Sequence, residues 1–464
     1  MISFLQLVPL FWAGYFFNEP LFWLHWAGFA RLCFLYQARR RGNFWKDFLA
    51  PCWGVFLAVY SVCFFWMLLH DVWVYVLGVL IYSFFFPLLF LLHYLSTSKV
   101  RSQLVDVAAA FGIFFTFEFL LSRIPAMESV GLDIFFQPPV AVLCVLKFIN
   151  FKVWSSWVFA TCFAISCWAL EKKGRPLVLL LVGGMAALVF FAHAQDEFSW
   201  GREKKGRTVK VALVQPNLPY SDEWRDSYFV EIKKKYCELA SKAALGAPDM
   251  IVFPLYSLPG DVYREPAFLE DLARTARCPV LIAAHVPIKA GDEAFDLGFM
   301  NLALLYNSDG TVRDIYQAVD ALPFLYQYVK KAEKYRVIRG PFGKLGVLLC
   351  YEDMIPRHSR AAARDGVGVL VALSNPGLFQ KTPLPYYQLF QDQIRAAETG
   401  LPLVRVSENG YSALIDQKGR IVQKTKLGTE EILQVELSGF GPGESGGEAP
   451  RNPLLDEVGR LKRS

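Results

Sequence analysis

Long uninterrupted runs of apolar residues fill the first 200 positions and constrain the fold more than any other feature of the sequence. Segments such as 48–69, 72–95 and 177–195 each supply about the 20 residues with which a helix crosses ~30 Å of hydrocarbon. Soluble helices seldom run so far without a charge. We therefore expect a polytopic transmembrane domain over residues 1–200, built of about seven helices. The expected spans are 2–18, 20–37, 48–69, 72–95, 104–122, 152–170 and 177–195.

A further apolar piece at 134–149 is harder to assign. It is interrupted by Pro138 and Pro139 and reaches the cation Lys147 near its end. Proline removes a backbone donor and breaks a helix, so this segment is expected to lie in the membrane interface. Seven and eight spans both remain open at this point.

The orientation of the spans follows from the lysine and arginine content of the short loops. The loops after the second, fourth and sixth expected spans are the cationic ones, and such loops resist translocation. They are therefore expected in the cytoplasm, and the large C-terminal part on the other side of the membrane. A basic patch at 202–207 runs against this rule, which long translocated domains obey weakly. The cations are Arg39, Arg40, Arg41 and Lys46, then Lys99 and Arg101, then Lys172, Lys173 and Arg175.

Charge and cysteine content narrow the functional classes. The formal net charge is +6, but much of it flanks the membrane segments, and no basic helix or RNA-binding signature is present, so nucleic acid is not expected as a partner. Of nine cysteines, only Cys237, Cys278 and Cys350 fall in the soluble part, without metal-ligand spacing. No metal or cofactor is expected, and the disulfide state of Cys237 and Cys278 stays open.

The sequence pattern changes in residues 208–438, where short β-rich runs alternate with amphipathic stretches. This pattern is typical of an α/β layer fold. The Gly- and Pro-rich stretch that follows, 439–464, is expected to be a flexible tail. No apolar stretch follows it. Expected strands are 209–215, 250–253, 280–284, 301–306, 344–349, 367–373, 402–407 and 412–416, and expected helices are 225–244, 266–276, 357–364 and 386–398.

Five ordered blocks in this part carry a resemblance to the carbon-nitrogen hydrolase (nitrilase) domain. They read VKVALVQPN at 209–217, PDMIVFPLYSLP at 248–259, LLCYEDMIP at 348–356, LSNPGLF at 373–379 and RAAETGLPLVRVSENGYSALID at 395–416. With a multi-span region in front, the chain resembles the bacterial apolipoprotein N-acyltransferases. The resemblance implies a membrane α-helical bundle joined to an α/β domain, a nitrilase-like four-layer α-β-β-α sandwich. It also implies a bacterial cytoplasmic (inner) membrane, with the domain on the periplasmic side.

The resemblance further implies an activity and its substrates. In that family a cysteine takes an acyl chain from a phospholipid as a thioester and passes it to the lipidated N-terminal cysteine of a lipoprotein. Phospholipid and lipoprotein N-termini are the implied partners, and any protein partner is unknown. Cys350 matches the nucleophile position, and Glu352 is the acid beside it.

Two other catalytic positions depart from the family pattern. The general base, a glutamate after the proline of the second block, is replaced by Leu255, which follows Pro254. The lysine that steadies the oxyanion is replaced by Ala318. The family's lid region is also expected to be short here, and its closing C-terminal membrane helix absent. Loss of a general base typically forfeits ~10²- to 10⁴-fold in rate, and loss of an oxyanion donor ~10²- to 10³-fold.

Three readings follow, and the sequence favours the second. The first is an active lipoprotein N-acyltransferase that recruits Glu352 as base and one of Lys330, Lys331 or Lys381 as cation. The second is a catalytically silent relative that binds lipid or lipoprotein, or regulates a membrane partner. The third is an amidase on a membrane anchor, which needs the same missing glutamate and lysine.

Overall fold

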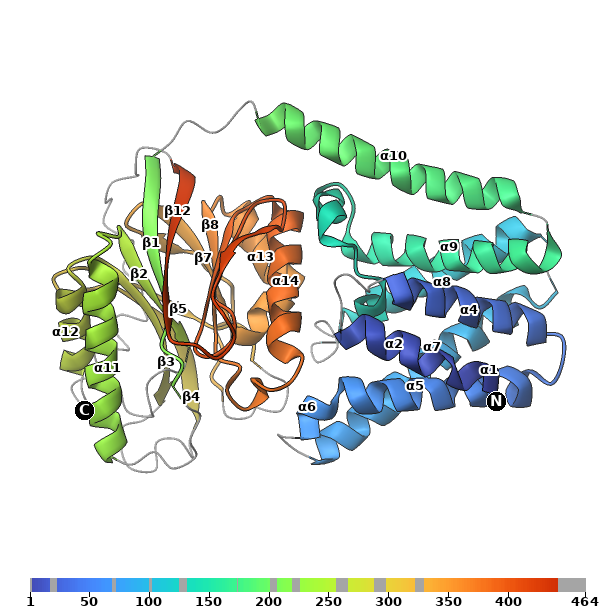
Figure 1. The fold of residues 1–464 in the computed structure, drawn as a ribbon, viewed down its shortest axis with the longest axis horizontal. Coiled ribbons are helices and arrows are strands. Elements are labelled where there is room, and N and C mark those ends of the chain that lie inside the picture. The colour runs from blue at the N-terminus through green and yellow to red at the C-terminus, as the bar shows by residue number, and fades with distance from the viewer. Residues whose placement is uncertain are drawn as a thin grey trace. The chain divides into compact units, whose positions relative to one another are not determined.

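The computed structural model describes residues 2–16, 23–68, 72–99, 102–124, 132–172, 174–200, 207–218, 226–255, 266–287, 298–321 and 329–440. The chain divides into two compact units, Met1–Asp196 and Glu197–Ser464. The first unit is helical and the second is an α/β domain (Figure 1). The expected tail at 439–464 lies almost entirely outside the described residues.

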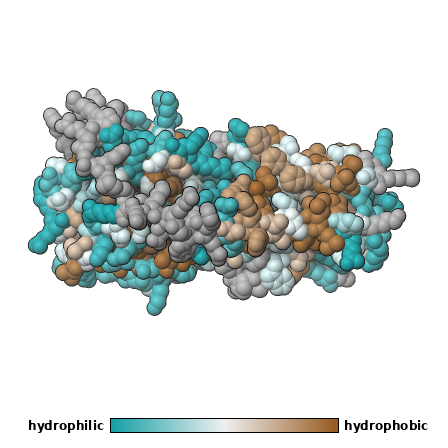
Figure 2. All heavy atoms as spheres, turned by 90° about the horizontal axis from the view of Figure 1, so that it is seen from above, coloured by the Kyte–Doolittle hydropathy of each residue, from teal (hydrophilic) through white to brown (hydrophobic). Residues whose placement is uncertain are grey.

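The first unit is a bundle of apolar helices. Five of its helical stretches are long and apolar enough to cross a membrane: Trp45–Cys63, Val72–Thr97, Gln103–Leu121, Phe151–Glu171 and Arg175–Gln195. Hydrophobic residues gather on the surface of this unit, whereas the surface of the α/β domain is mostly hydrophilic (Figure 2). The helices are α1 (Ile2–Leu5), α2 (Leu7–Phe16), α4 (Trp23–Arg39), α5 (Ala50–Cys63), which the π-helix Trp45–Leu49 precedes, α6 (Phe65–Leu68), α7 (Val72–Thr97), α8 (Gln103–Leu121), α9 (Phe151–Glu171) and α10 (Arg175–Trp200).

The five long stretches match the last five expected spans. The first two expected spans, 2–18 and 20–37, correspond to the shorter helices α1, α2 and α4. Of these, α4 has only 17 residues and carries His25, Arg31 and Gln37, which lower its mean hydropathy. A count of about seven spans therefore stays a prediction.

The proline-interrupted segment forms two short 3-10 helices, Leu132–Phe136 and Val140–Lys147, and not a long α-helix. Its side chains are largely buried within the bundle, where the Phe135 ring lies 5.8 Å from that of Phe11. Glu118 of α8 accepts a hydrogen bond from the Leu132 amide at 2.7 Å. These contacts make the segment part of the bundle core. Non-helical backbone is tolerated in a membrane protein where other parts of the protein surround it.

The α/β domain contains two six-stranded sheets. The first has the order β12-β1-β2-β3-β4-β5, with β1 and β2 parallel, β2 and β3 parallel, and the other pairs antiparallel. Its strands are β1 (Arg207–Gln215), β2 (Met250–Leu255), β3 (Val280–Pro287), β4 (Phe299–Tyr306), β5 (Val312–Gln317) and β12 (Glu431–Phe440). The helices α11 (Asp226–Ala244) and α12 (Pro266–Ala276) cover its outer face (Figure 1).

The second sheet has the order β11-β10-β9-β8-β7-β6, with β7, β8 and β9 parallel at its centre. Its strands are β6 (Ile338–Gly340), β7 (Gly343–Leu349), β8 (Val369–Ser374), β9 (Leu403–Ser407), β10 (Ala413–Ile415) and β11 (Ile421–Lys424). The helices α13 (Pro356–Arg364) and α14 (Leu384–Thr399) cover it on the side away from the first sheet (Figure 1).

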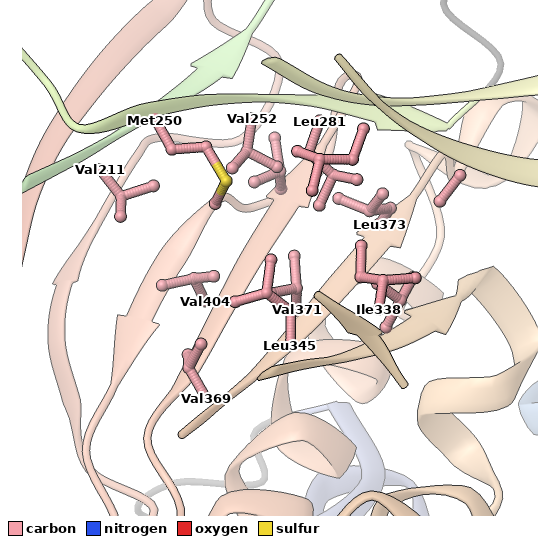
Figure 3. Close-up of a cluster of buried hydrophobic side chains, with 14 of the residues drawn as sticks. Val211, Met250, Val252, Leu281, Ile338, Leu345, Val369, Val371, Leu373 and Val404 are labelled. Atoms are coloured by element: carbon pink, nitrogen blue, oxygen red, sulfur yellow. The ribbon is translucent and has the colours of Figure 1, made fainter. Parts of the chain in front are cut away.

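The main core of the domain lies between the two sheets. Aliphatic side chains of β1, β2 and β3 point toward those of β7, β8 and β9, and most are fully buried (Figure 3). Helices on both outer faces and two facing sheets inside make the four-layer α-β-β-α sandwich that the resemblance implied, so the fold prediction is confirmed.

Four strands escaped the sequence analysis: β5, β6, β11 and β12. The most important is β12, which closes the first sheet by pairing antiparallel with β1, Val209 opposite Leu437. Edge strands alternate buried and exposed positions, so their apolar signal is weak. Cys237 and Cys278, whose pairing was open, are both free thiols in the structure.

Candidate active site

Cys350 lies directly after the buried strand β7, at the start of a 3-10 turn, Cys350–Met354. Its φ is +50°, in the left-handed region that residues with a side chain seldom adopt. Such a conformation costs about 1–2 kcal/mol and persists only where the surroundings impose it. A strained turn that presents a nucleophile at the end of a strand is a known device of hydrolytic enzymes.

Leu255 and Ala318 lie in the same apolar cluster against which Cys350 packs. Leu255 is the last residue of β2, and Ala318 follows β5 directly. Both side chains are fully buried. Positions that are far apart in the sequence thus belong to one core cluster, which extends over both sheets, and the two that were expected to match the family's base and cation are apolar. Whether these positions once carried that chemistry stays a prediction.

The Cys350 thiol is held in its neutral form. Burial is the largest cause that raises its pKa, to about 12, and the negative charge of Asp353 adds to it. The positive charge of Arg405 and the backbone N–H groups of Asn375 and Tyr351 act in the opposite direction. At neutral pH a thiol with such a pKa is almost entirely protonated.

Glu352 is a structural anchor. It is fully buried, and burial raises its pKa. Its oxygens accept hydrogen bonds from the Tyr316 hydroxyl at 2.9 and 3.0 Å and from the amides of Val319 at 2.7 Å and Leu349 at 2.9 Å. These bonds tie the segment after β5 to the end of β7. None of its bonds among the described residues goes to Cys350, so its geometry does not favour the role of general base.

The three lysines considered as replacement cations are exposed, whereas Cys350 packs against the buried cluster. They are Lys330, Lys331 and Lys381. The backbone of Lys330 is fixed, since its amide donates to the Phe299 carbonyl at 2.8 Å. An exposed ammonium is strongly hydrated and poorly placed to stabilise an oxyanion in a buried site.

A buried ionic network beside Cys350 was not foreseen from the sequence. Arg405 of β9 has a side chain that is 1% exposed and contacts Asp353 at 2.9 Å and Asp392 of α14 at 2.6 Å. Burial and the mutual repulsion of the two acids raise the pKa of Asp353. The signal was present in the sequence, because an arginine inside the apolar strand LVRVS needs partners if it is buried.

A second buried cluster joins the segment after Ala318 to helix α13. His358 is nearly fully buried, and its Nε2 lies 2.7 Å from Asp320 Oδ2. Arg357 also pairs with Asp320, and the Tyr335 ring stacks on that of His358 at 5.7 Å. Among the described residues, no group of three or more His, Cys, Asp or Glu side chains is placed to hold a metal ion.

Comparisons with known proteins agree with the fold and the order of the blocks. Residues 210–439 match the family model of the carbon-nitrogen hydrolases. An apolipoprotein N-acyltransferase of Geobacter metallireducens is 30% identical over 263 residues, which are 52% of this chain and 50% of that protein. A second, from Agrobacterium fabrum, is 25% identical over 368 residues, 73% of this chain and 68% of that protein.

A third relative, the apolipoprotein N-acyltransferase of Allorhizobium ampelinum, is 28% identical over 56% of this chain and 54% of its own length. The chain thus spans about half the length of the first curated relatives it matches. Among solved structures, a carbon-nitrogen hydrolase from Helicobacter pylori is 17% identical with a TM-score of 0.42, and covers 55% of this chain and 93% of that one. An amidase from Nesterenkonia sp. is 19% identical with a TM-score of 0.40, and covers 50% and 90%.

Proposed function

We propose that the chain, whose residues 210–439 match the family model of the carbon-nitrogen hydrolases, is a divergent relative of the apolipoprotein N-acyltransferases whose acyl-transfer chemistry is silent or strongly impaired. The protein acts by binding. Its ligand is a lipoprotein N-terminus, the class of substrate that the relatives' name describes, a phospholipid, as the family resemblance implies, or a membrane partner that it regulates.

One observation carries this proposal: Leu255 and Ala318 are fully buried apolar residues in the cluster that holds Cys350. Attack of a thiol on a phospholipid ester needs a base to take the thiol proton and a donor to hold the tetrahedral oxyanion. Neither side chain has a titratable or hydrogen-bonding group. Because coupled catalytic groups do not add simply, we expect a total loss of at least ~10³-fold in rate.

The setting of the domain supports ligands that belong to a membrane. The five long apolar helices place the chain in a lipid bilayer. The cations after the second, fourth and sixth expected spans support a location in the bacterial cytoplasmic membrane, with the hydrolase domain on the periplasmic side. That is the side on which lipoprotein N-termini would be met.

The strained turn at Cys350 favours an alternative, an acyltransferase that has recruited other groups. A left-handed cysteine costs free energy that a glycine at this position would avoid, so the strain favours a use for the thiol. Glu352 and the three lysines named above do not supply the missing groups in the arrangement observed. The alternative therefore requires groups that a bound substrate would assemble.

Complementation separates the two functions. The chain is expressed in bacteria depleted of their own N-acyltransferase, and lipoprotein N-termini are analysed by mass spectrometry. We expect no growth and no triacylated lipoprotein, although membrane fractions contain the protein. A Cys350→Ala variant is the matched control, and we expect it to behave as the unaltered chain. Growth that depends on Cys350, together with triacylated lipoprotein, would establish the alternative.

A further inference from the structure

Arg405 is the centre of a buried hydrogen-bonded network that includes Asp353 of the Cys350 turn. Its Nη1 donates to Asp353 Oδ2 at 2.9 Å and Asp392 Oδ2 at 2.6 Å. Its Nη2 donates to Ser374 Oγ at 2.7 Å and Gln388 Oε1 at 3.1 Å. Such a planar fork of donors can hold several acceptors in one fixed geometry, which an ammonium cannot do.

Two of these partners belong to the segments that contact the thiol. Asp353 lies in the 3-10 turn that Cys350 begins. Ser374 ends β8, and the next residue, Asn375, has its backbone N–H directed at Cys350, as does that of Tyr351. Arg405 therefore joins both segments whose amides face the sulfur, and through Asp392 and Gln388 it fixes them to α14.

We propose that Arg405 is the positioning residue of the Cys350 turn, which holds the cysteine in its left-handed conformation and keeps the Tyr351 and Asn375 amides aimed at the sulfur. It does not touch a reacting atom. It acts through Asp353 on one side of the cysteine and through Ser374 on the other. This role is independent of acyl transfer.

The chain offers a second buried arginine for comparison. Arg395 of α14 is also 1% exposed, and its Nε lies 2.9 Å from Glu398 Oε1. Glu398 in turn contacts Ser359 and Arg360 of α13. Arg395 is thus tied to the outer helices, whereas Arg405 is tied to the turn itself. If burial of an arginine merely stabilised the domain, replacing either residue would have the same effect on Cys350.

Alkylation of Cys350 distinguishes these roles without any acyl donor. The full-length chain in detergent micelles is treated with iodoacetamide between pH 7 and 11, and modification of the Cys350 peptide is followed by mass spectrometry. The variants are Arg405→Met, Arg405→Lys and the control Arg395→Met. Melting temperatures are measured in the same micelles, so that only folded samples are compared.

We expect the Cys350 turn to relax in Arg405→Met, so that the thiol becomes more exposed. Burial is the largest cause of the raised pKa, so its loss should outweigh the loss of the Arg405 charge and of the two amides, which lower the pKa. Alkylation at pH 8 should then rise at least ~10-fold, because each unit by which the pKa falls toward ~8.5 increases the thiolate fraction tenfold. Arg395→Met should leave rate and pH profile within about twofold of the unaltered chain, since the Arg395 side chain pairs with Glu398 and acts on Asp353 of the turn only through its charge. The alkylation rate of Arg405→Met should also begin to level off at a lower pH than that of the unaltered chain.

Equal rates and profiles in Arg405→Met and Arg395→Met would overturn the proposal and leave Arg405 a stabilising residue only. If Arg405→Met fails to fold, Arg405→Lys decides, because it keeps the charge but loses the fork. A faster alkylation in the folded lysine variant, with an earlier bend in its pH profile, supports the positioning role. An unchanged rate and profile in that variant rejects it.

Discussion

At the residue scale, the surroundings of the Cys350 sulfur decide what this site can do. Cys350 has a left-handed backbone, and it packs against the cluster that contains Leu255 and Ala318, the residues expected at the positions of the family's base and cation. The thiol is therefore held neutral by burial and by the neighbouring negative charge of Asp353.

The raised pKa of Cys350 predicts a dependence of stability on pH. The folded-state pKa of about 12 lies above the ~8.5 of an unfolded thiol. The folded state thus binds the proton more tightly, and its contribution to stability is complete below pH ~8.5 and is lost as the pH rises toward 12. Cys350→Ala should remove this loss. Above pH 9 the free energy of unfolding of the unaltered chain should therefore fall more steeply than that of Cys350→Ala, by up to ~1.4 kcal/mol per pH unit.

The measurement is chemical unfolding of the two proteins in the same micelles at several pH values. Other cysteines and tyrosines titrate in the same range, so only the difference between the two proteins is informative. If the free energy of unfolding changes with pH by the same amount in the unaltered chain and in Cys350→Ala, the pKa of the Cys350 thiol is the same in the folded and unfolded states.

Glu352 gives a second prediction at this scale. Its carboxylate is fully buried and accepts bonds from Tyr316, Val319 and Leu349. A glutamine would point N–H donors at groups that are themselves donors, so Glu352→Gln should destabilise the domain by about 2–4 kcal/mol. Thermal melting checks this, with Glu238→Gln on the exposed face of α11 as the control, for which no measurable change is expected. An unchanged melting temperature in Glu352→Gln would contradict the role of Glu352 as a structural anchor.

Sequence reasoning located part of this site and missed the rest for a physical reason. Cys350 was found because it follows a strongly apolar strand, and Leu255 and Ala318 were assigned from Pro254 and Tyr316, the neighbouring residues that resemble the family's pattern. Arg405 and Asp353 were missed as partners because their pairing joins β9 to the turn after β7, and no local pattern encodes a contact across parallel strands. The sequence shows that a buried arginine needs partners, but it does not show which residues they are.

At the element scale, β7 and α13 pack without space between them. A Cβ built on Gly346 of β7 would lie 2.7 Å from the Ala362 Cβ and 2.9 Å from the Leu370 Cδ2. Gly346→Ala should therefore overpack the layer behind the nucleophile strand and cost about 1–3 kcal/mol. The melting temperature measures this. Gly112→Ala on α8, where a Cβ meets nothing within 4 Å, is the matched control and should not destabilise. Equal melting of both variants would contradict the packing.

The elements with a strong apolar signal were predicted well, and those without one were not. The strand β8, VLVALS, is buried along its whole length, and the sequence analysis placed it to within a few residues. The strand β12 was missed because exposed charges such as Glu436 interrupt its apolar residues. The segment 134–149 was expected at the membrane interface, and this stays a prediction. Its packing against the bundle could not be predicted, because contacts such as that of Glu118 with the Leu132 amide are non-local.

At the scale of the whole molecule, the loop cations predict the topology. The loops that contain Arg39 to Arg41 and Lys172 to Arg175 should be cytoplasmic, and the hydrolase domain should be outside. Cysteine-accessibility labelling in intact cells tests this. A reporter at position 464 should react with an impermeant reagent added from outside, and reporters at 41 and 172 should not. Reaction of the first reporter only after the cells are opened would require an even number of spans.

The central claim is that the hydrolase scaffold is intact while its acyl-transfer chemistry is not, and formation of an acyl thioester on Cys350 tests it most directly. The purified protein is reconstituted with radiolabelled phospholipid, and label that hydroxylamine releases is counted, with Cys350→Ala as the blank. We predict no label above this blank in the unaltered chain, and a gain of label in the Leu255→Glu, Ala318→Lys double variant, in which a base and a cation return to the cluster around Cys350. Label on Cys350 of the unaltered chain at a useful rate would contradict the account, because other residues would then supply both missing functions.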